Sequence, residues 1–140
     1  MAIILDSSGL LSAIDDRQED HIPVREFLES VREPLVISPF VLAELDYMVM
    51  TRLGQAREVA LLREVARGAY ILEPFSAEDV SDAIEVIENY ADLGVGLADA
   101  SNVVLSRRRE TNDLLTLDER HFRTLRGYRE RPFRVLPADA

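Results

Sequence analysis

Four acidic residues of this chain stand beside segments whose apolar character predicts burial: Asp6, Glu44, Asp99 and Asp118. A carboxylate without a partner is unfavourable in such a place because the loss of hydration disfavours its charged form. A shared divalent cation would keep all four ionised, since hard divalent ions take oxygen ligands. A few carboxylates with retained waters suit Mg²⁺ or Mn²⁺ better than a closed Ca²⁺ cage. The chemistry expected of such a site is activation of a water molecule.

Two of the four acids follow short apolar runs. Asp6 ends the run Ala2-Ile3-Ile4-Leu5, and Asp118 ends Leu114-Leu115-Thr116-Leu117. Continuous apolar runs of this length are typical of strands buried on both faces in a parallel sheet. Because functional groups gather at the carboxyl ends of parallel strands, we expect both acids at one rim of the sheet.

The other two acids belong to predicted helices. Glu44 lies three residues after Val41 and four before Met48, which puts it on the apolar stripe of a helix that begins after Ser38-Pro39. Asp99 lies in the first turn of a helix that follows Gly94-Val95-Gly96. A helix N-terminus favours a carboxylate at this position.

Each acid also has an ordinary structural explanation. Asp6, Asp99 and Asp118 could cap or stabilise the first turn of a helix. Glu44 could form a buried ion pair with an arginine. The metal hypothesis rests on the conjunction of the four positions.

The elements that must position these acids alternate along the chain. Strands are predicted over 2–5, 35–37, 70–72, 114–117 and 134–136, and helices over about 7–15, 21–33, 39–53, 55–67, 77–90, 97–109 and 121–125. Ser38 and Ser76 are expected to cap the helices that follow them. This alternation predicts an α/β fold, a three-layer α/β/α sandwich around a mainly parallel sheet of about five strands, forming one domain over residues 1–140.

Composition narrows the function. The chain has no cysteine, which excludes disulfides, thiolate metal sites and cysteine nucleophiles and fits a cytoplasmic setting. Neither an export signal nor a membrane span is apparent. All sixteen basic residues are arginine, so mechanisms that need lysine are excluded. His21 and His121 are far apart in sequence and no lysine is present to support a phosphate, so acid–base catalysis by two histidines is disfavoured. His121 is expected to pack or to contact a nucleic acid.

The arginines are unevenly distributed. Residues 107–134 hold nine arginines against five acids, although the whole chain has a net charge of −10. Regional charge steers a polyanion more than total charge does. Arg107, Arg108, Arg109 and Arg120 could therefore contact the phosphates of a nucleic acid, or could simply complement a helix C-terminus.

Four segments together resemble the motifs of the PIN-domain nucleases, and most closely the VapC-type toxins of bacterial toxin–antitoxin pairs. They are Ile4-Leu5-Asp6-Ser7-Ser8, Ser38-Pro39-Phe40-Val41-Leu42-Ala43-Glu44, Leu93-Gly94-Val95-Gly96-Leu97-Ala98-Asp99-Ala100 and Leu115-Thr116-Leu117-Asp118-Glu119-Arg120-His121-Phe122. They span about residues 3–125 in the expected order, and no acidic position is substituted.

The resemblance implies an acidic quartet, namely Asp6, Glu44, Asp99 and Asp118, with Ser8 and Thr116 as polar support. It implies one or two Mg²⁺ or Mn²⁺ ions that activate water for attack on an RNA phosphodiester. It also implies a cognate antitoxin as partner and a homodimer. The alternative within the family is a catalytically silent module that binds RNA or protein.

Two other classes of protein place acids at strand ends. A phosphatase of the haloacid-dehalogenase type needs a second aspartate two residues after the first, and position 8 is serine. A phospho-receiver domain relies on a lysine at its phosphate pocket, and this chain has none. Both alternatives are disfavoured by these substitutions.

Overall fold

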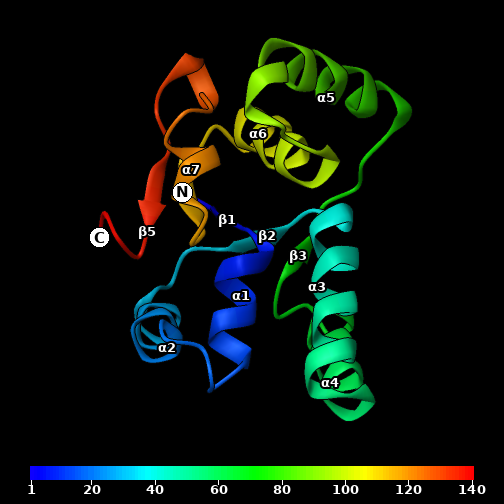
Figure 1. Ribbon diagram of the computed structural model, residues 1–140, viewed down its shortest axis with the longest axis vertical. Helices are drawn as coiled ribbons and strands as arrows, with labels where there is room; N and C mark the ends of the chain where they lie inside the picture. The colour runs from blue at the N-terminus through cyan, green and yellow to red at the C-terminus, as the bar shows by residue number, and fades with distance from the viewer.

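A five-stranded parallel sheet forms the centre of the protein. The computed structural model describes residues 1–140, and its strands are β1 (Ile3–Leu5), β2 (Leu35–Ile37), β3 (Ile71–Leu72), β4 (Asp113–Leu115) and β5 (Arg134–Leu136). Their order is β3-β2-β1-β4-β5, and every pair is parallel (Figure 1). The predicted α/β fold is confirmed. The carboxyl end of central β1, where Asp6 lies, is flanked by β2 and β4.

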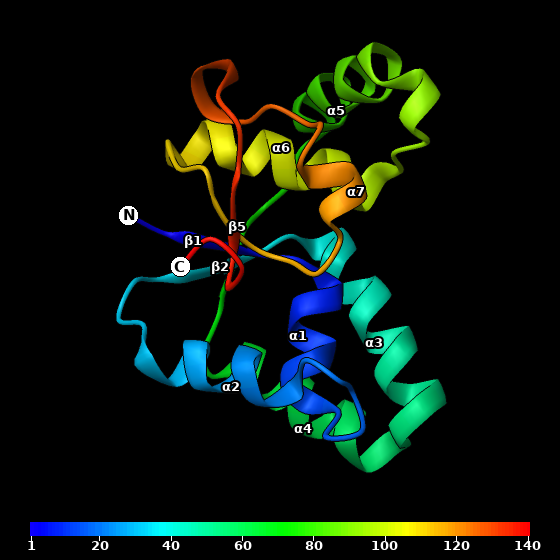
Figure 2. The same ribbon diagram turned by 60° about the vertical axis from the view of Figure 1, so that its left-hand side comes forward.

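Helices cover both faces of the sheet. α1 (Ser7–Ile14), α2 (His21–Ser30), α3 (Pro39–Leu53) and α4 (Gln55–Ala66) lie on one face, and α5 (Ala77–Asn89), α6 (Leu97–Arg109) and α7 (Glu119–Phe122) lie on the other (Figures 1 and 2). Alternate residues of β1 enter different cores, because successive strand side chains point to opposite faces. Ile4 packs with the α5–α6 layer, whereas Ile3 and Leu5 pack with the α1–α4 layer. None of the helices combines the length and apolarity that a membrane span requires.

Helix starts follow the capping signals of the sequence in two places. The Ser38 side chain accepts a hydrogen bond from the Phe40 backbone N–H, with Pro39 in the first turn. Ser76 and Asp79 form a reciprocal capping box at the start of α5. At the start of α1, Asp6 occupies the N-cap position without a capping hydrogen bond from its side chain, and Ser7 and Ser8 lie inside the helix.

The predicted strand 114–117 is too long, and the helix after it begins earlier than expected. β4 ends at Leu115, and α7 runs from Glu119 to Phe122. Side-chain hydroxyls replace the sheet partners here: the Leu117 N–H donates to Ser8 Oγ at 2.9 Å, and the Asp118 N–H donates to Thr116 Oγ1 at 3.0 Å. These bonds turn the chain away from the sheet, and this turn carries Asp118.

Gly9 lets α1 pack closely on β4. A Cβ atom at this position would lie 2.8 Å from Leu115 Cγ and 3.0 Å from the Leu115 carbonyl oxygen. Such contacts force side chains or backbone to move in a packed core. The close approach holds the start of α1 against the end of β4, so that Asp6 and Thr116 are neighbours.

Gly9→Ala is therefore expected to lower the free energy of unfolding by roughly 1–3 kcal/mol, measured by urea denaturation. Gly96→Ala is the comparison, because a Cβ there meets no atom within 4 Å; its loss should be smaller. If Gly9 were exposed on its helix, replacement by alanine would instead raise the free energy of unfolding by up to about 1 kcal/mol. A gain of stability in Gly9→Ala would contradict the close packing.

Candidate metal centre

Asp6 is the most enclosed acid of the candidate site, with 4% of its surface exposed. Thr116 Oγ1 donates a hydrogen bond to Asp6 Oδ2 at 2.7 Å, and Ser8 Oγ donates to the same oxygen at 3.2 Å. Asn102 Nδ2 approaches Asp6 Oδ1 at 3.4 Å. Ser8 and Thr116 thus lie where polar support for this carboxylate was expected.

Glu44 lies closer to solvent than the sequence suggested. The buried residues of α3 are Val41, Leu45 and Val49, spaced four apart, and Glu44 is exposed beside this stripe. The prediction that it lies on the apolar stripe is wrong, because the stripe follows the i, i+4, i+8 positions. Glu44 forms no ion pair with an arginine; it accepts a hydrogen bond from the Ser7 hydroxyl at the start of α1.

Asp99 and Asp118 meet at His121. His121 Nδ1 lies 2.9 Å from Asp99 Oδ2 and 2.9 Å from Asp118 Oδ2. The other oxygen of Asp118 accepts a hydrogen bond from the His121 backbone N–H at 3.1 Å, so Asp118 also caps α7 as one alternative had it. Capping occupies only one of its oxygens, and the second remains directed at the imidazole.

The four acids influence one another electrostatically. Burial raises the pKa of Asp6 to about 6, the Thr116 hydrogen bond opposes this rise, and the charges of Asp99 and Glu44 add to it. Burial also raises the pKa of Asp99; nearby His121 opposes the rise, and Asp118 and Glu44 increase it. Like charges are therefore gathered without a lysine or arginine among them, and a cation would relieve both the burial and the repulsion.

Two further atoms suit a bound cation. Asn102 Oδ1 is buried and accepts no hydrogen bond, and the buried His121 Nδ1 lies 2.9 Å from two carboxylate oxygens without an aligned hydrogen bond to either. Buried polar groups without partners are uncommon and often mark an absent ion or water. Together with the four carboxylates they make a donor set, rich in oxygen, that fits a divalent metal.

Sequence reasoning missed three residues of this site. Asn102 and His121 each lie three residues after a quartet acid, Asp99 and Asp118, and so share a helix face with it. On α6 that spacing could have revealed Asn102, whereas the place of His121 depends on how the four-residue α7 docks through Phe122. The Ser7 contact with Glu44 joins two helices that are distant in sequence, so no local pattern could have predicted it.

Comparison with known proteins identifies the family of this chain. A family model described as "PIN domain" matches residues 3–127. The chain belongs to the PIN-domain family. It is 44% identical over 135 residues to Ribonuclease VapC26 of Mycobacterium tuberculosis, a match that covers 96% of this chain and 100% of that protein.

Solved structures share the fold of this PIN domain. M. tuberculosis VapC20, described as a sarcin–ricin loop cleaving toxin, superposes with a TM-score of 0.78 at 18% identity, over 83% of this chain and 89% of that one. A chain of VapBC2 from Rickettsia felis, crystallised with a DNA fragment from its promoter, superposes with a TM-score of 0.67 at 20% identity, over 96% and 98% of the two chains.

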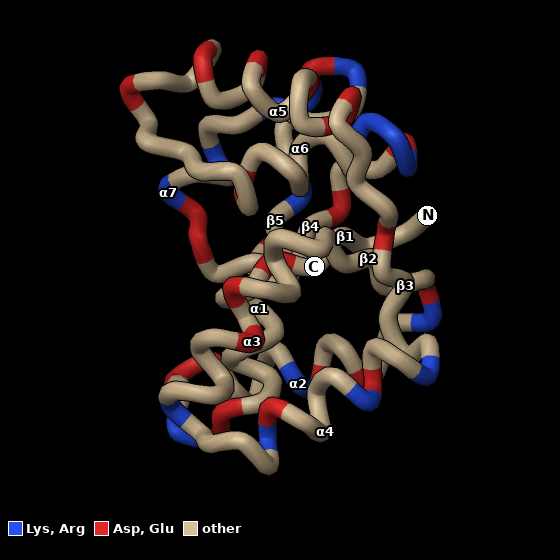
Figure 3. The backbone as a smooth tube through the Cα atoms, turned by 90° about the vertical axis from the view of Figure 1, so that its right-hand side faces the viewer, with Lys and Arg blue, Asp and Glu red and all other residues tan.

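Most arginines proposed to contact RNA are engaged within the PIN domain itself. Arg109 Nε donates to the buried Glu73 at 2.6 Å, and Arg108 bridges Glu73 and Asp79 at 3.1 and 2.5 Å. Arg107 pairs with Glu130. Arginine and acid positions are interspersed along the backbone tube in Figure 3. Arg120 is exposed and forms no ion pair. Contact of any of the four arginines with RNA stays a prediction.

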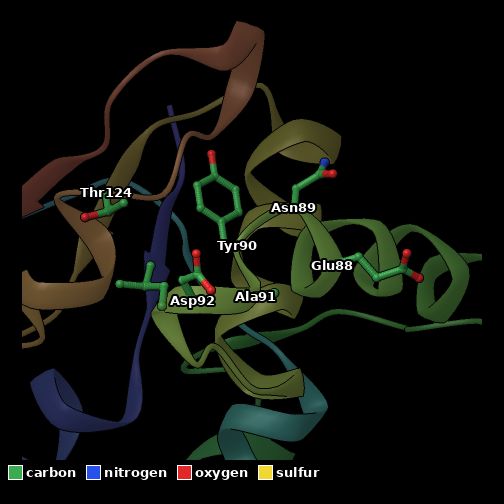
Figure 4. A pocket seen from close by; sticks show the side chains of 7 residues that line it. Glu88, Asn89, Tyr90, Ala91, Asp92 and Thr124 are labelled. Atoms are coloured by element: carbon green, nitrogen blue, oxygen red, sulfur yellow. The ribbon is translucent and has the colours of Figure 1, made fainter.

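Asp92, the acid seven residues before Asp99, lies outside the quartet. It lines a separate hollow of about 410 Å³ with residues that include Tyr90 and Thr124. Figure 4 shows Tyr90, Asp92 and Thr124 around this hollow, with the Glu88 side chain directed away. Asp92 is exposed and offers a matched control for the buried acid at position 6.

Divalent ions are expected to stabilise this protein through Asp6. Wild type should gain about 2.7 kcal/mol when Mn²⁺ or Mg²⁺ is present at a hundred times its Kd. Asp6→Asn should unfold at the same or a higher temperature than wild type without metal, because it removes a buried charge, and should lose the metal-induced rise in Tm. Scanning calorimetry with and without the ion measures both effects. Asp92→Asn should keep the metal-induced rise in Tm. The assigned site would be contradicted if Asp92→Asn lost this rise or if Asp6→Asn kept it.

Proposed function

We propose that this PIN domain is a metal-dependent endoribonuclease that acts as the toxin of a toxin–antitoxin pair. The observation that carries the proposal is the gathering of four acids at one rim of the sheet, with raised pKa values for Asp6 and Asp99. The 44% identity to a protein named Ribonuclease VapC26 supports RNA as the substrate. The cytoplasm, where RNA is abundant, is the proposed site of action.

In the proposed reaction, Asp6, Glu44, Asp99 and Asp118 would hold Mg²⁺ or Mn²⁺. The bound ion would lower the pKa of a water and offset charge on the phosphate. Thr116 and Ser8 orient the Asp6 carboxylate by donating to one of its oxygens, and Asn102 approaches the other. Ser7 fixes Glu44 in the same manner. These bonds hold the charged form of the acids in place before RNA arrives, which avoids reorganisation during the reaction.

Arg120 is the best placed of the four candidate arginines to contact RNA. It lies two residues after Asp118 on α7, is exposed, and has no acidic partner. Lys and Arg neutralise phosphates without regard to sequence. For Arg107, Arg108 and Arg109 the internal ion pairs favour a structural role, and RNA contact would compete with those pairs.

A cognate antitoxin protein is the proposed partner. Solved relatives of the same fold are VapBC complexes from Rickettsia felis and Salmonella typhimurium. Tyr47 and Met50 on α3 are 64% and 42% exposed, and Ile22 on α2 is 66% exposed. Apolar residues at such exposure suit contact with a second protein. The expected homodimer stays a prediction.

Cleavage of RNA should require the quartet. Asp6→Asn and Glu44→Gln are each expected to lower the rate of cleavage of single-stranded RNA by about 10²–10³-fold, because each removes a charge that stabilises the reacting phosphate. The measurement is a time course with purified protein and Mn²⁺ or Mg²⁺. Asp16→Asn, which changes the same charge in an exposed loop, should cleave like wild type.

Equal cleavage by Asp6→Asn and wild type would overturn the enzymatic proposal. RNA binding without any cleavage, by wild type and both variants, would favour the alternative of a catalytically silent module. The fragments also report the chemistry, since attack by water is expected to leave a 5′-phosphate and a 3′-hydroxyl.

The toxin role predicts an effect on cells. Expression of wild type should arrest growth, expression of Asp6→Asn should not, and co-expression of a small protein encoded beside this chain should restore growth. Colony counts after induction measure all three. Growth arrest by wild type and Asp6→Asn alike would show that toxicity does not arise from the metal centre.

A further inference from the structure

We propose that His121 is an additional ligand of the metal centre, through Nδ1, and that it gives the centre a preference for Mn²⁺ over Mg²⁺. The proposal deepens the proposed function and rests on its metal dependence. His121 belongs to no expected ligand set; the four acids supply only oxygen. Its imidazole nitrogen can bind a metal, unlike the amide nitrogen of Asn102, which lies near Asp6.

Three possible ligand atoms converge at this point. Asp99, Asp118 and His121 each offer one ligand atom, and the three atoms lie within 4.8 Å of one another. The imidazole nitrogen is buried, is 2.9 Å from each carboxylate oxygen, and has no aligned hydrogen bond to either. Three electron-rich atoms at such distances repel one another unless a cation lies among them. A proton on Nδ1 could form one well-aligned hydrogen bond with one carboxylate, whereas a metal ion could be coordinated by all three atoms.

The spacing fits a common ion. Neighbouring ligand atoms of an octahedral ion at about 2.1 Å are about 3 Å apart. The separation of 2.9 Å between His121 Nδ1 and each carboxylate oxygen agrees with this value. Neutral imidazole is a common metal ligand in proteins, and coordination by Nδ1 leaves the N–H on Nε2.

The fold fixes the imidazole firmly. α7 is only four residues long, but Phe122, which follows His121 and ends the helix, is fully buried. Its ring packs edge-to-face on the ring of Phe133, with 5.6 Å between the ring centroids. Arg123 then pairs with Glu119 at 2.8 Å and with Asp139 at 2.6 Å, which ties α7 to the C-terminal residues. A ring held this way can bind an ion without first being ordered, and this lowers the cost of binding.

A nitrogen ligand changes which metal is favoured. Mg²⁺ prefers oxygen donors and near-ideal octahedral geometry, whereas imidazole suits transition metals. Replacing His121 by glutamine should therefore weaken Mn²⁺ binding more than Mg²⁺ binding. The expected change is roughly tenfold in Kd for Mn²⁺, in the range seen when groups around a metal are removed, and clearly smaller for Mg²⁺.

The test is pulsed electron paramagnetic resonance of the full-length protein with bound Mn²⁺, which detects a nitrogen atom coordinated to the ion. Wild type should show the ¹⁴N coupling of a histidine ligand, and His121→Gln should lose it. His21→Gln is the matched control: His21 is the only other histidine, and its Nδ1 contacts the Ser12 carbonyl oxygen at 2.8 Å. This variant should keep the coupling. Calorimetric titration with Mn²⁺ and Mg²⁺ gives the two affinities.

Bound Mn²⁺ without ¹⁴N coupling in wild type, or coupling that persists in His121→Gln, would overturn the proposal and leave the proposed ribonuclease function intact. Absence of Mn²⁺ binding together with absence of RNA cleavage would overturn both. If His121→Gln does not fold, the spectra of wild type and His21→Gln still decide, because in the latter His121 is the sole histidine.

Discussion

Negative charge that the protein itself does not neutralise is the constraint around which this structure is arranged. β1 delivers Asp6 to the rim of the sheet, where only 4% of its surface is exposed, and the charges of Glu44 and Asp99 raise its pKa further. No lysine exists in the chain. The arginines that could have neutralised these acids instead pair with Glu73, Asp79, Asp139 and other acids outside the quartet. A buried charge without a partner is destabilising, so folding sets up a site whose unmet requirement is a cation.

The parallel sheet makes this arrangement possible. Strands that run in one direction bring their carboxyl ends together, so residues more than a hundred positions apart in sequence, such as Asp6 and Thr116, come within hydrogen-bond distance. Hydroxyl donors then hold the acids in fixed orientations without neutralising them. Gly9 contributes through its lack of a side chain, since it allows α1 to approach Leu115. Holding like charges together lowers the stability of the fold, but it preorganises the charges of the site. Such preorganisation is the largest contribution to the rates of many enzymes.

Much of this could be read from the sequence, because the strongest signals are local. Short apolar runs predicted the strands, and Ser38-Pro39 and Ser76 predicted helix starts that the structure confirms. The errors arose where tertiary contacts override local pattern. Glu44 was placed on the apolar stripe, yet α3 turns it toward solvent and the Ser7 hydroxyl. The position of His121 between two acids depends on how α7 docks through Phe122, which no periodicity in a four-residue helix can reveal.

The central claim is that the four acids at the rim exist to hold a divalent ion. Crystals grown with Mn²⁺ test it most directly, because anomalous scattering at the manganese edge locates the ion without reference to any assumed ligand. The account predicts one or two anomalous peaks within coordination distance of carboxylate oxygens of Asp6, Asp99 and Asp118, with Glu44 bound directly or through water. Crystals that contain Mn²⁺ but show no peak among these acids, or show it only elsewhere on the protein, would contradict it.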